Sequence, residues 1–276
     1  MNNADAAILS PESGLSWAQR YPALWRVSAW ASFVLCGLCV ILAYADSRTL
    51  FDISVWIKPF KFYLSSGVYF VTLVLLAALM PAQYFATLRG RIMVWLAVLC
   101  MWFELGYITL QAALGEASHF NGSTALHANM YSLMGVGAVM LVVVVAWLGL
   151  EIARQRGIRS PLLLAVVLGT LLTFALGGGF GGVLGSNGGH WVGECRSDAG
   201  GLPFFGWSTR CGDLRASHFF GLHAMQVIPL LGLAAQRWLS RALGFVVVVV
   251  GSTAYAGLSV ATFVQAMNGQ PLLSTL

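Results

Sequence analysis

Charged residues are scarce in this sequence. Asp, Glu, Lys and Arg together make up only 9% of the 276 residues, and 58% are hydrophobic. A soluble domain carries roughly 25% charged residues. The mean hydropathy is +0.79. This composition excludes a soluble globular enzyme, a disordered chain and a nucleic-acid-binding protein, because each of these needs far more charge.

Several cofactor and catalytic motifs are also missing. The last apolar stretch contains no Lys, which excludes a retinal Schiff base in the usual rhodopsin position. The glycine-rich run at residues 177–182 lacks the Lys-Ser or Lys-Thr pair of a phosphate-binding loop. Neither Gly-x-Ser-x-Gly nor His-Glu-x-x-His occurs. The function therefore has to be sought in single polar residues within apolar sequence.

Long apolar runs predict an all-α, polytopic integral membrane protein. A helix needs about 20 apolar residues to cross a bilayer, and the runs are too long and continuous for the alternating strands of a barrel. The seven predicted spans are 27–45, 62–80, 91–114, 126–150, 161–179, 216–236 and 242–267. Lipid is therefore the first expected partner.

The basic residues predict the orientation. Lys and Arg concentrate in cytoplasmic loops, and nine of the fifteen lie on one predicted side: Arg20, Arg26, Arg89, Arg91, Arg154, Arg156, Arg159, Arg237 and Arg241. We therefore expect a multi-pass protein of a bacterial-type inner membrane, with a cytoplasmic N-terminus and a periplasmic C-terminus. Residues 1–26 would form a cytoplasmic segment. Residues 27–276 would form the seven-helix domain, with a Gly-rich outer loop at about 178–214.

Two of the five cysteines fall in that predicted outer loop. Cys195 and Cys211 would face an oxidising space, where a disulfide is stable. The other three cysteines lie inside apolar spans, where a thiol behaves as a small apolar group. The sequence therefore favours a disulfide in this loop, and whether Cys195 and Cys211 are bonded is left to the structure.

A short motif occurs twice. Residues 117–122 and 216–221 share Ala-Ser-His-Phe-x-Gly, and each copy is followed by Leu-His-Ala, with a three-residue insertion at 123–125 in the first copy. We interpret this as a parallel internal repeat, in which spans four and five match spans six and seven. A two-fold axis along the membrane normal would then place histidines from the two hairpins opposite each other.

All five histidines fall on the predicted outer side: His119, His127, His190, His218 and His223. Opposed imidazoles suit a six-coordinate haem iron or a multi-histidine metal centre. We expect haem b, with His127 and His223 as axial ligands. His119 and His218 would be alternative ligands or partners of the propionates, and His190 would be a further metal ligand from the loop.

Three charged residues lie beside this histidine layer or below it. Glu104 is the only Asp, Glu, Lys or Arg well inside a predicted span, and an intramembrane carboxylate suggests proton transfer. It would lie about 22 Å below His119 if the helix continued at 1.5 Å per residue. Lys58 and Lys61, at the outer start of span two, could bind haem propionates, an anionic substrate or lipid phosphates.

These observations lead to three functional hypotheses. The first is a membrane redox protein with a His-ligated haem b, which carries out electron transfer or oxidoreduction with a quinol or a periplasmic redox partner. The second is a metalloenzyme with copper, zinc or two irons in the same histidine cluster. The third is a metal-free transporter or receptor, whose histidine layer senses pH or binds an anion.

Overall fold

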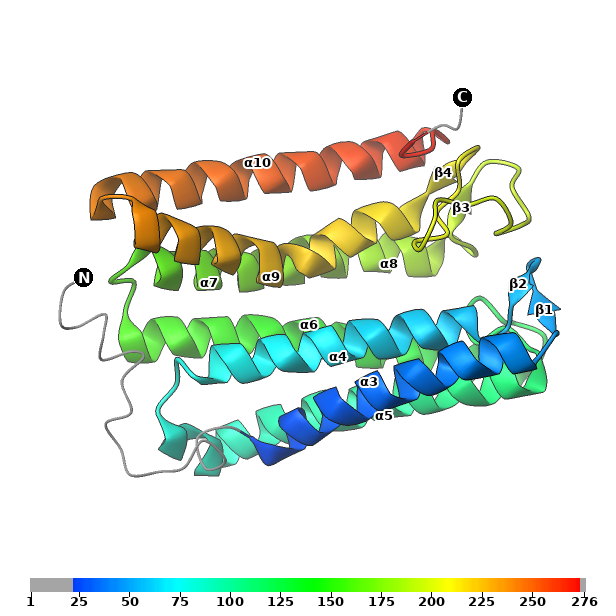
Figure 1. Ribbon diagram of the computed structural model, residues 1–276, viewed down its shortest axis with the longest axis horizontal. Coiled ribbons are helices and arrows are strands. Elements are labelled where there is room, and N and C mark those ends of the chain that lie inside the picture. The colour runs from blue at the N-terminus through cyan, green and yellow to red at the C-terminus, as the bar shows by residue number, and fades with distance from the viewer. Residues whose placement is uncertain (1–21, 274–276) are drawn as a thin grey trace.

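The computed structural model describes residues 22–273, and within them seven helices are long and apolar enough to cross a membrane (Figure 1). They are α3 (Ala23–Ala45), α4 (Ile57–Ala77), α5 (Leu88–Leu114), α6 (Ala125–Arg156), the composite span Pro161–Ser186, α9 (Leu214–Trp238) and α10 (Arg241–Met267). Large apolar side chains such as Trp30 and Ile41 are exposed on the helices, as contact with lipid requires. The predicted all-α, seven-span membrane protein is confirmed. Most of the predicted segment 1–26 lies outside the described residues.

The fifth span has three parts. It consists of α7 (Pro161–Leu172), a π-helical turn η2 (Thr173–Gly177) and α8 (Gly178–Ser186). Residues 178–186 are thus helical, although the sequence assigned them to a loop. The helix continues because Phe180 extends the apolar face and is buried, and because the small residues around it allow α8 to pack against α9. A π-helical turn is rare and often lies at a functional site.

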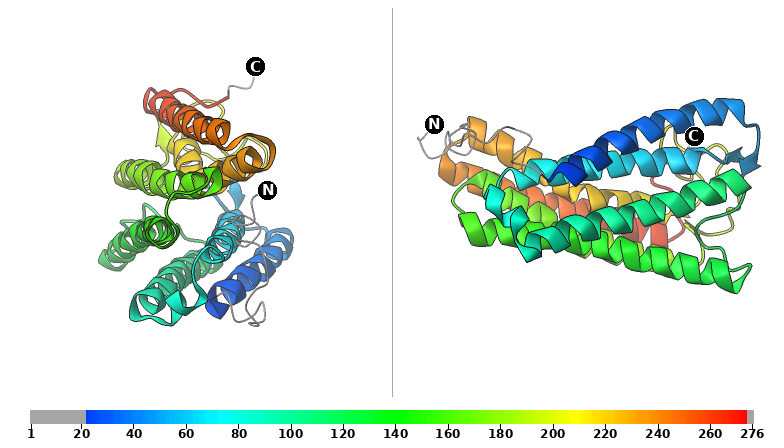
Figure 2. Two further views of the ribbon diagram at one scale, coloured as in Figure 1. Left: turned by 90° about the vertical axis from the view of Figure 1, so that its left-hand side faces the viewer. Right: turned by 90° about the horizontal axis from the view of Figure 1, so that it is seen from below.

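The helices form two bundles (Figure 2). In the first bundle, α3 packs on α4 and α5 packs on α6, whereas in the second α9 lies between α7 and α10. The contact of α6 with α7 and η2 joins the two bundles. A hydrogen bond from Nε2 of Gln226 to Oγ1 of Thr72, 3.0 Å long, also connects α9 to α4 across the gap between them.

Two small hairpins mark one end of the molecule, which we call the hairpin end. β1 (Thr49–Leu50) pairs with β2 (Ile53–Ser54), and β3 (Trp191–Val192) pairs with β4 (Gly212–Asp213) (Figure 1). The long loop, residues 187–213, lies here. Within it Cys195 and Cys211 form a disulfide, which the sequence favours.

The opposite end, which we call the arginine end, carries only short connections. They include the 3₁₀ helix η1 (Ala82–Ala86) and the turns at 157–160 and 239–240. Arg89, Arg154, Arg156 and Arg241 lie in or beside these connections. Basic residues thus cluster where the loops are shortest.

Candidate functional site

The connection between α5 and α6 folds back into the first bundle. Gly115 ends α5 with a left-handed backbone (φ +75°), a conformation that favours glycine. The chain then returns along the bundle, so that Nε2 of His119 lies 3.8 Å from Oε1 of Glu104. The predicted separation of about 22 Å along a continuous helix is therefore wrong. The reversal at Gly115 brings the two side chains together.

Lys58 completes this site. It lies in the first turn of α4, and its ammonium interacts electrostatically with both Glu104 and His119. Its Nζ also lies 5.9 Å from the ring centroid of Phe62, a distance that suits a cation–π contact. Within residues 22–273 Lys58 forms no salt bridge at direct contact distance. We call Lys58, Glu104 and His119 the acid–base group.

Aromatic rings and a hydroxyl hold His119 in place. Its ring packs against Phe62 (centroids 5.5 Å apart) and Tyr131 (5.7 Å), and its Nδ1 lies 3.2 Å from Oγ of the buried Ser118. Burial and the positive charge of Lys58 hold the pKa of His119 well below its ordinary value of 6.5. His119 is therefore a neutral imidazole at neutral pH, with Nε2 directed at Glu104.

His127 belongs to the rim of the same region. It lies in the first turn of α6, where its Nδ1 is 2.8 Å from Oγ of Ser123 and its Nε2 is 3.4 Å from Oε2 of Glu116. Both ring nitrogens thus face polar groups of the α5–α6 connection.

His218 and His223 lie together in the second bundle. Both are on α9, beside the π-helical turn, and Nδ1 of His218 bonds to the carbonyl oxygen of Gly177 (3.0 Å). Because a carbonyl can only accept, Nδ1 carries the proton. The lone pair on Nε2 of His218 takes part in no hydrogen bond within residues 22–273. The ring of His223 lies against that of Phe219 in a tilted arrangement (centroids 4.1 Å apart).

A third polar group ties the long loop to α9. Arg215 NH2 lies 2.8 Å from Asp198 and 2.7 Å from Asp213, and Nε2 of His190 lies 3.1 Å from Asp198. Although burial raises the pKa of Asp198, the hydrogen bond from His190 and the charge of Arg215 outweigh it and lower the pKa. His190 is thus paired with a carboxylate inside the loop. Lys61 reaches the same loop by donating to the carbonyl oxygen of Phe205 (2.7 Å).

The structure therefore brings some predicted residues together and leaves others apart. Lys58, Glu104 and His119 form one group, and His218 and His223 form another. No contact between described residues joins His127 to His223 or His119 to His218, and these two opposed pairs stay predictions.

Sequence reasoning did not identify the Arg215 network or the π-helical turn. Asp213 and Arg215 lie two positions apart at the start of a span, and that proximity was the available signal. The role of Asp198 depends on how the long loop folds, which no local pattern indicates. The π-helical turn has no recognisable signature in the sequence.

The positions of the possible metal ligands limit which kind of metal site the protein can form. Within residues 22–273, no three His, Cys, Asp or Glu side chains lie close enough together to hold a metal ion. This finding disfavours a bare metal ion held by these side chains alone. It does not concern haem, which needs only one or two axial imidazoles.

Comparison with protein-family models, with curated proteins and with solved structures found no match to this chain.

Proposed function

We propose that the protein transfers protons to or from a substrate bound at the hairpin end, through Glu104 and His119. The observation that carries this proposal is the 3.8 Å approach of Oε1 of Glu104 to Nε2 of His119 in a site shielded by Phe62 and Tyr131. A carboxyl group and an imidazole at this separation can exchange a proton through one water molecule or after a small movement. The ammonium of Lys58 would stabilise negative charge that develops on the substrate.

Oxidoreduction of a quinol is the reaction that best fits this group and the sequence together. A quinol loses two protons together with two electrons, so the buried acid–base pair would take up the protons, and the periplasmic redox partner would take up the electrons. A quinol is also soluble in the lipid that surrounds the helices. In this role the neutral imidazole of His119 would relay a proton between the quinol and Glu104, and Glu104 would hold it.

A titration of His119 by NMR, with ¹⁵N-labelled histidine in lipid nanodiscs, tests the acid–base group. In the wild-type protein we expect His119 to stay neutral well below pH 6.5. The Lys58→Met variant should raise the pKa of His119, because a nearby positive charge no longer opposes protonation. The Glu104→Gln variant should also change the titration, because a direct neighbour of Nε2 loses its charge.

The matched control for this titration is Glu116→Gln. Glu116 is a carboxylate of the same connection, but it faces His127 and not His119. This variant should leave the His119 titration unchanged. An ordinary pKa for His119 in the wild type, or no response to Lys58→Met, would contradict the proposal.

A His-ligated redox cofactor, with haem b preferred, is the second candidate function. One observation favours it: Nδ1 of His218 is fixed by the carbonyl of Gly177, which leaves Nε2 free. Histidine ligands of metals are commonly oriented by such a bond from the other ring nitrogen. On α9, His218 would be one ligand through Nε2, whereas His223 lies about 140° further round the same helix. His223 remains a candidate ligand together with His127 and His119 from the first bundle. Bound haem would supply one-electron transfer, for exchange with the quinol or with a periplasmic redox partner.

An absorption spectrum of the purified protein tests this candidate. After titration with haem, we expect a Soret band that His218→Ala abolishes. His190→Ala should retain the band, because His190 is engaged with Asp198 in the long loop. A protein that takes up no haem rules the candidate out, and elemental analysis of the same sample would detect copper, zinc or iron.

We further propose that the hairpin end faces the periplasm of a bacterial-type inner membrane. The disulfide at this end and the arginines at the other support this orientation. The internal repeat remains part of the proposal as well. Its two motifs differ in local structure, because residues 117–122 lie between helices whereas residues 216–221 lie within α9.

A further inference from the structure

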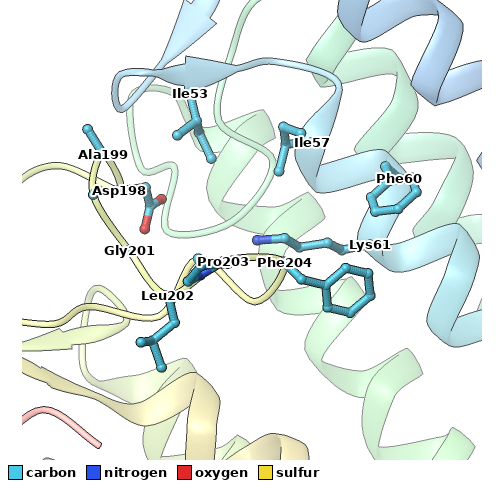
Figure 3. A pocket seen from close by; sticks show the side chains of 12 residues that line it. Ile53, Ile57, Phe60, Lys61, Asp198, Ala199, Gly201, Leu202, Pro203 and Phe204 are labelled. Carbon is cyan, nitrogen blue, oxygen red and sulfur yellow. The ribbon is translucent and has the colours of Figure 1, made fainter. Parts of the chain in front are cut away.

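A pocket of about 340 Å³ lies at the hairpin end, between α4 and the long loop (Figure 3). Ile57, Phe60 and Lys61 line it from α4, and Asp198, Leu202 and Phe204 line it from the loop. Figure 3 shows the Lys61 side chain extending into the pocket, with the rings of Phe60 and Phe204 on either side of its stem. The lining is thus mainly apolar, with the ammonium of Lys61 and the carboxylate of Asp198 as its charged groups.

The pocket lies beside the start of a membrane-spanning helix. Ile57, Phe60 and Lys61 belong to the first turns of a membrane-spanning helix, where hydrocarbon meets the interfacial layer. An amphiphilic molecule from the bilayer would therefore reach the pocket with its head.

The ammonium of Lys61 retains free binding capacity. It donates one hydrogen bond, to the carbonyl oxygen of Phe205, and within residues 22–273 no carboxylate forms a salt bridge with it. The nearby acids are occupied, since Asp198 binds His190 and Arg215, and Asp213 binds Arg215 and the backbone N–H of Ser208. An ammonium has several N–H donors, so Lys61 can donate further hydrogen bonds, and an anion is a strong acceptor for them.

We propose that this pocket binds an anionic phospholipid, with its phosphate headgroup on Lys61 and its acyl chain beside Phe60 and Phe204. The position beside the start of a membrane-spanning helix, the aromatic lining and the ammonium of Lys61, which forms no salt bridge within residues 22–273, all favour this occupant over a free anion. The lipid would fill the space between α4 and the long loop. This inference does not depend on the acid–base group, because none of Lys58, Glu104 and His119 lines the pocket.

Native mass spectrometry of the full chain in detergent tests the proposal. Phosphatidylglycerol should bind to the wild-type protein more tightly than phosphatidylcholine, and Lys61→Gln should weaken phosphatidylglycerol binding roughly tenfold. Phe204→Ala should weaken the binding of both lipids, because it removes apolar contact without changing charge. Phe204 is an exposed residue of the loop, so this second variant should fold normally. It therefore still tests the proposal if Lys61→Gln folds poorly.

The matched control is Arg210→Gln, which removes an exposed cation of the same loop outside the pocket and should preserve the lipid preference. The proposal is overturned if the two lipids bind equally well or if Lys61→Gln keeps the preference. It is also overturned if inorganic phosphate displaces the lipid, because the headgroup alone would then account for recognition. Loss of lipid binding would leave the titration of His119 unaffected, so the two proposals fail separately.

Discussion

The Arg215→Met variant should lose roughly 3–5 kcal/mol of stability, the range found when one partner of a buried ion pair is removed. The side chains of Asp213 and Asp198 are only 1% and 7% exposed, and Arg215 contacts both. Methionine has a similar length but no charge, so both carboxylates would be left buried with too few partners. Arg215 also donates to the carbonyl oxygen of Gly206, and that bond would be lost as well. We therefore expect the long loop to detach from α9.

Thermal unfolding in detergent, combined with limited proteolysis, measures this effect. The variant should unfold at a clearly lower temperature, and residues 187–213 should become sensitive to protease. Arg210→Met is the control, because Arg210 is exposed in the same loop and a surface substitution changes stability little. Equal stability of the two variants would show that the Arg215 network does not hold the loop.

The Gly221→Ala variant should separate α9 from the π-helical turn. A Cβ atom at position 221 would lie 2.6 Å from the backbone nitrogen of Gly177 and 2.8 Å from the carbonyl carbon of Leu176. Because these are backbone atoms, the clash can be relieved only by moving a helix. Overpacking of this kind costs roughly 1–3 kcal/mol, and small residues at helix crossings in membranes are what allow such close approach.

The effect of Gly221→Ala should also be visible at a neighbouring histidine. The bond from Nδ1 of His218 to the carbonyl of Gly177 spans the same crossing. The ¹⁵N resonance of Nδ1 should therefore shift when the two helices move apart. Gly182→Ala provides the control, because a Cβ at position 182 meets no atom within 4 Å and alanine favours helix over glycine. An unchanged melting temperature and an unchanged His218 resonance in Gly221→Ala would contradict the described crossing.

Hydropathy was enough to predict the membrane spans, because each helix has to be stable in lipid on its own. Every spanning helix must be apolar along its length and must satisfy its own backbone hydrogen bonds, so the seven apolar runs appear directly in the sequence. The disulfide was predictable for a similar reason, since two cysteines shared one polar loop. The ends of the helices were predicted less accurately. Pro59, for example, lies within the first turn of α4, where a missing N–H does no harm.

The geometry of the site was less predictable because it depends on irregular backbone. The approach of His119 to Glu104 follows from the reversal at Gly115, and extending a helix past that residue gave the wrong separation. The free Nε2 of His218 follows from the π-helical turn that presents the carbonyl of Gly177. Candidate residues could thus be named from their chemistry, but their partners depend on loops and helix crossings that local patterns do not encode.

The division into two bundles has a consequence for synthesis. Each bundle consists of helices that follow one another along the chain, so the helices from α3 to α6 leave the ribosome before any part of α7. The earlier half can therefore associate in the membrane while the later half is still being translated. Assembly would then finish when α7 packs against α6. Variants at this junction should therefore impair maturation of the nascent protein more than variants inside either bundle.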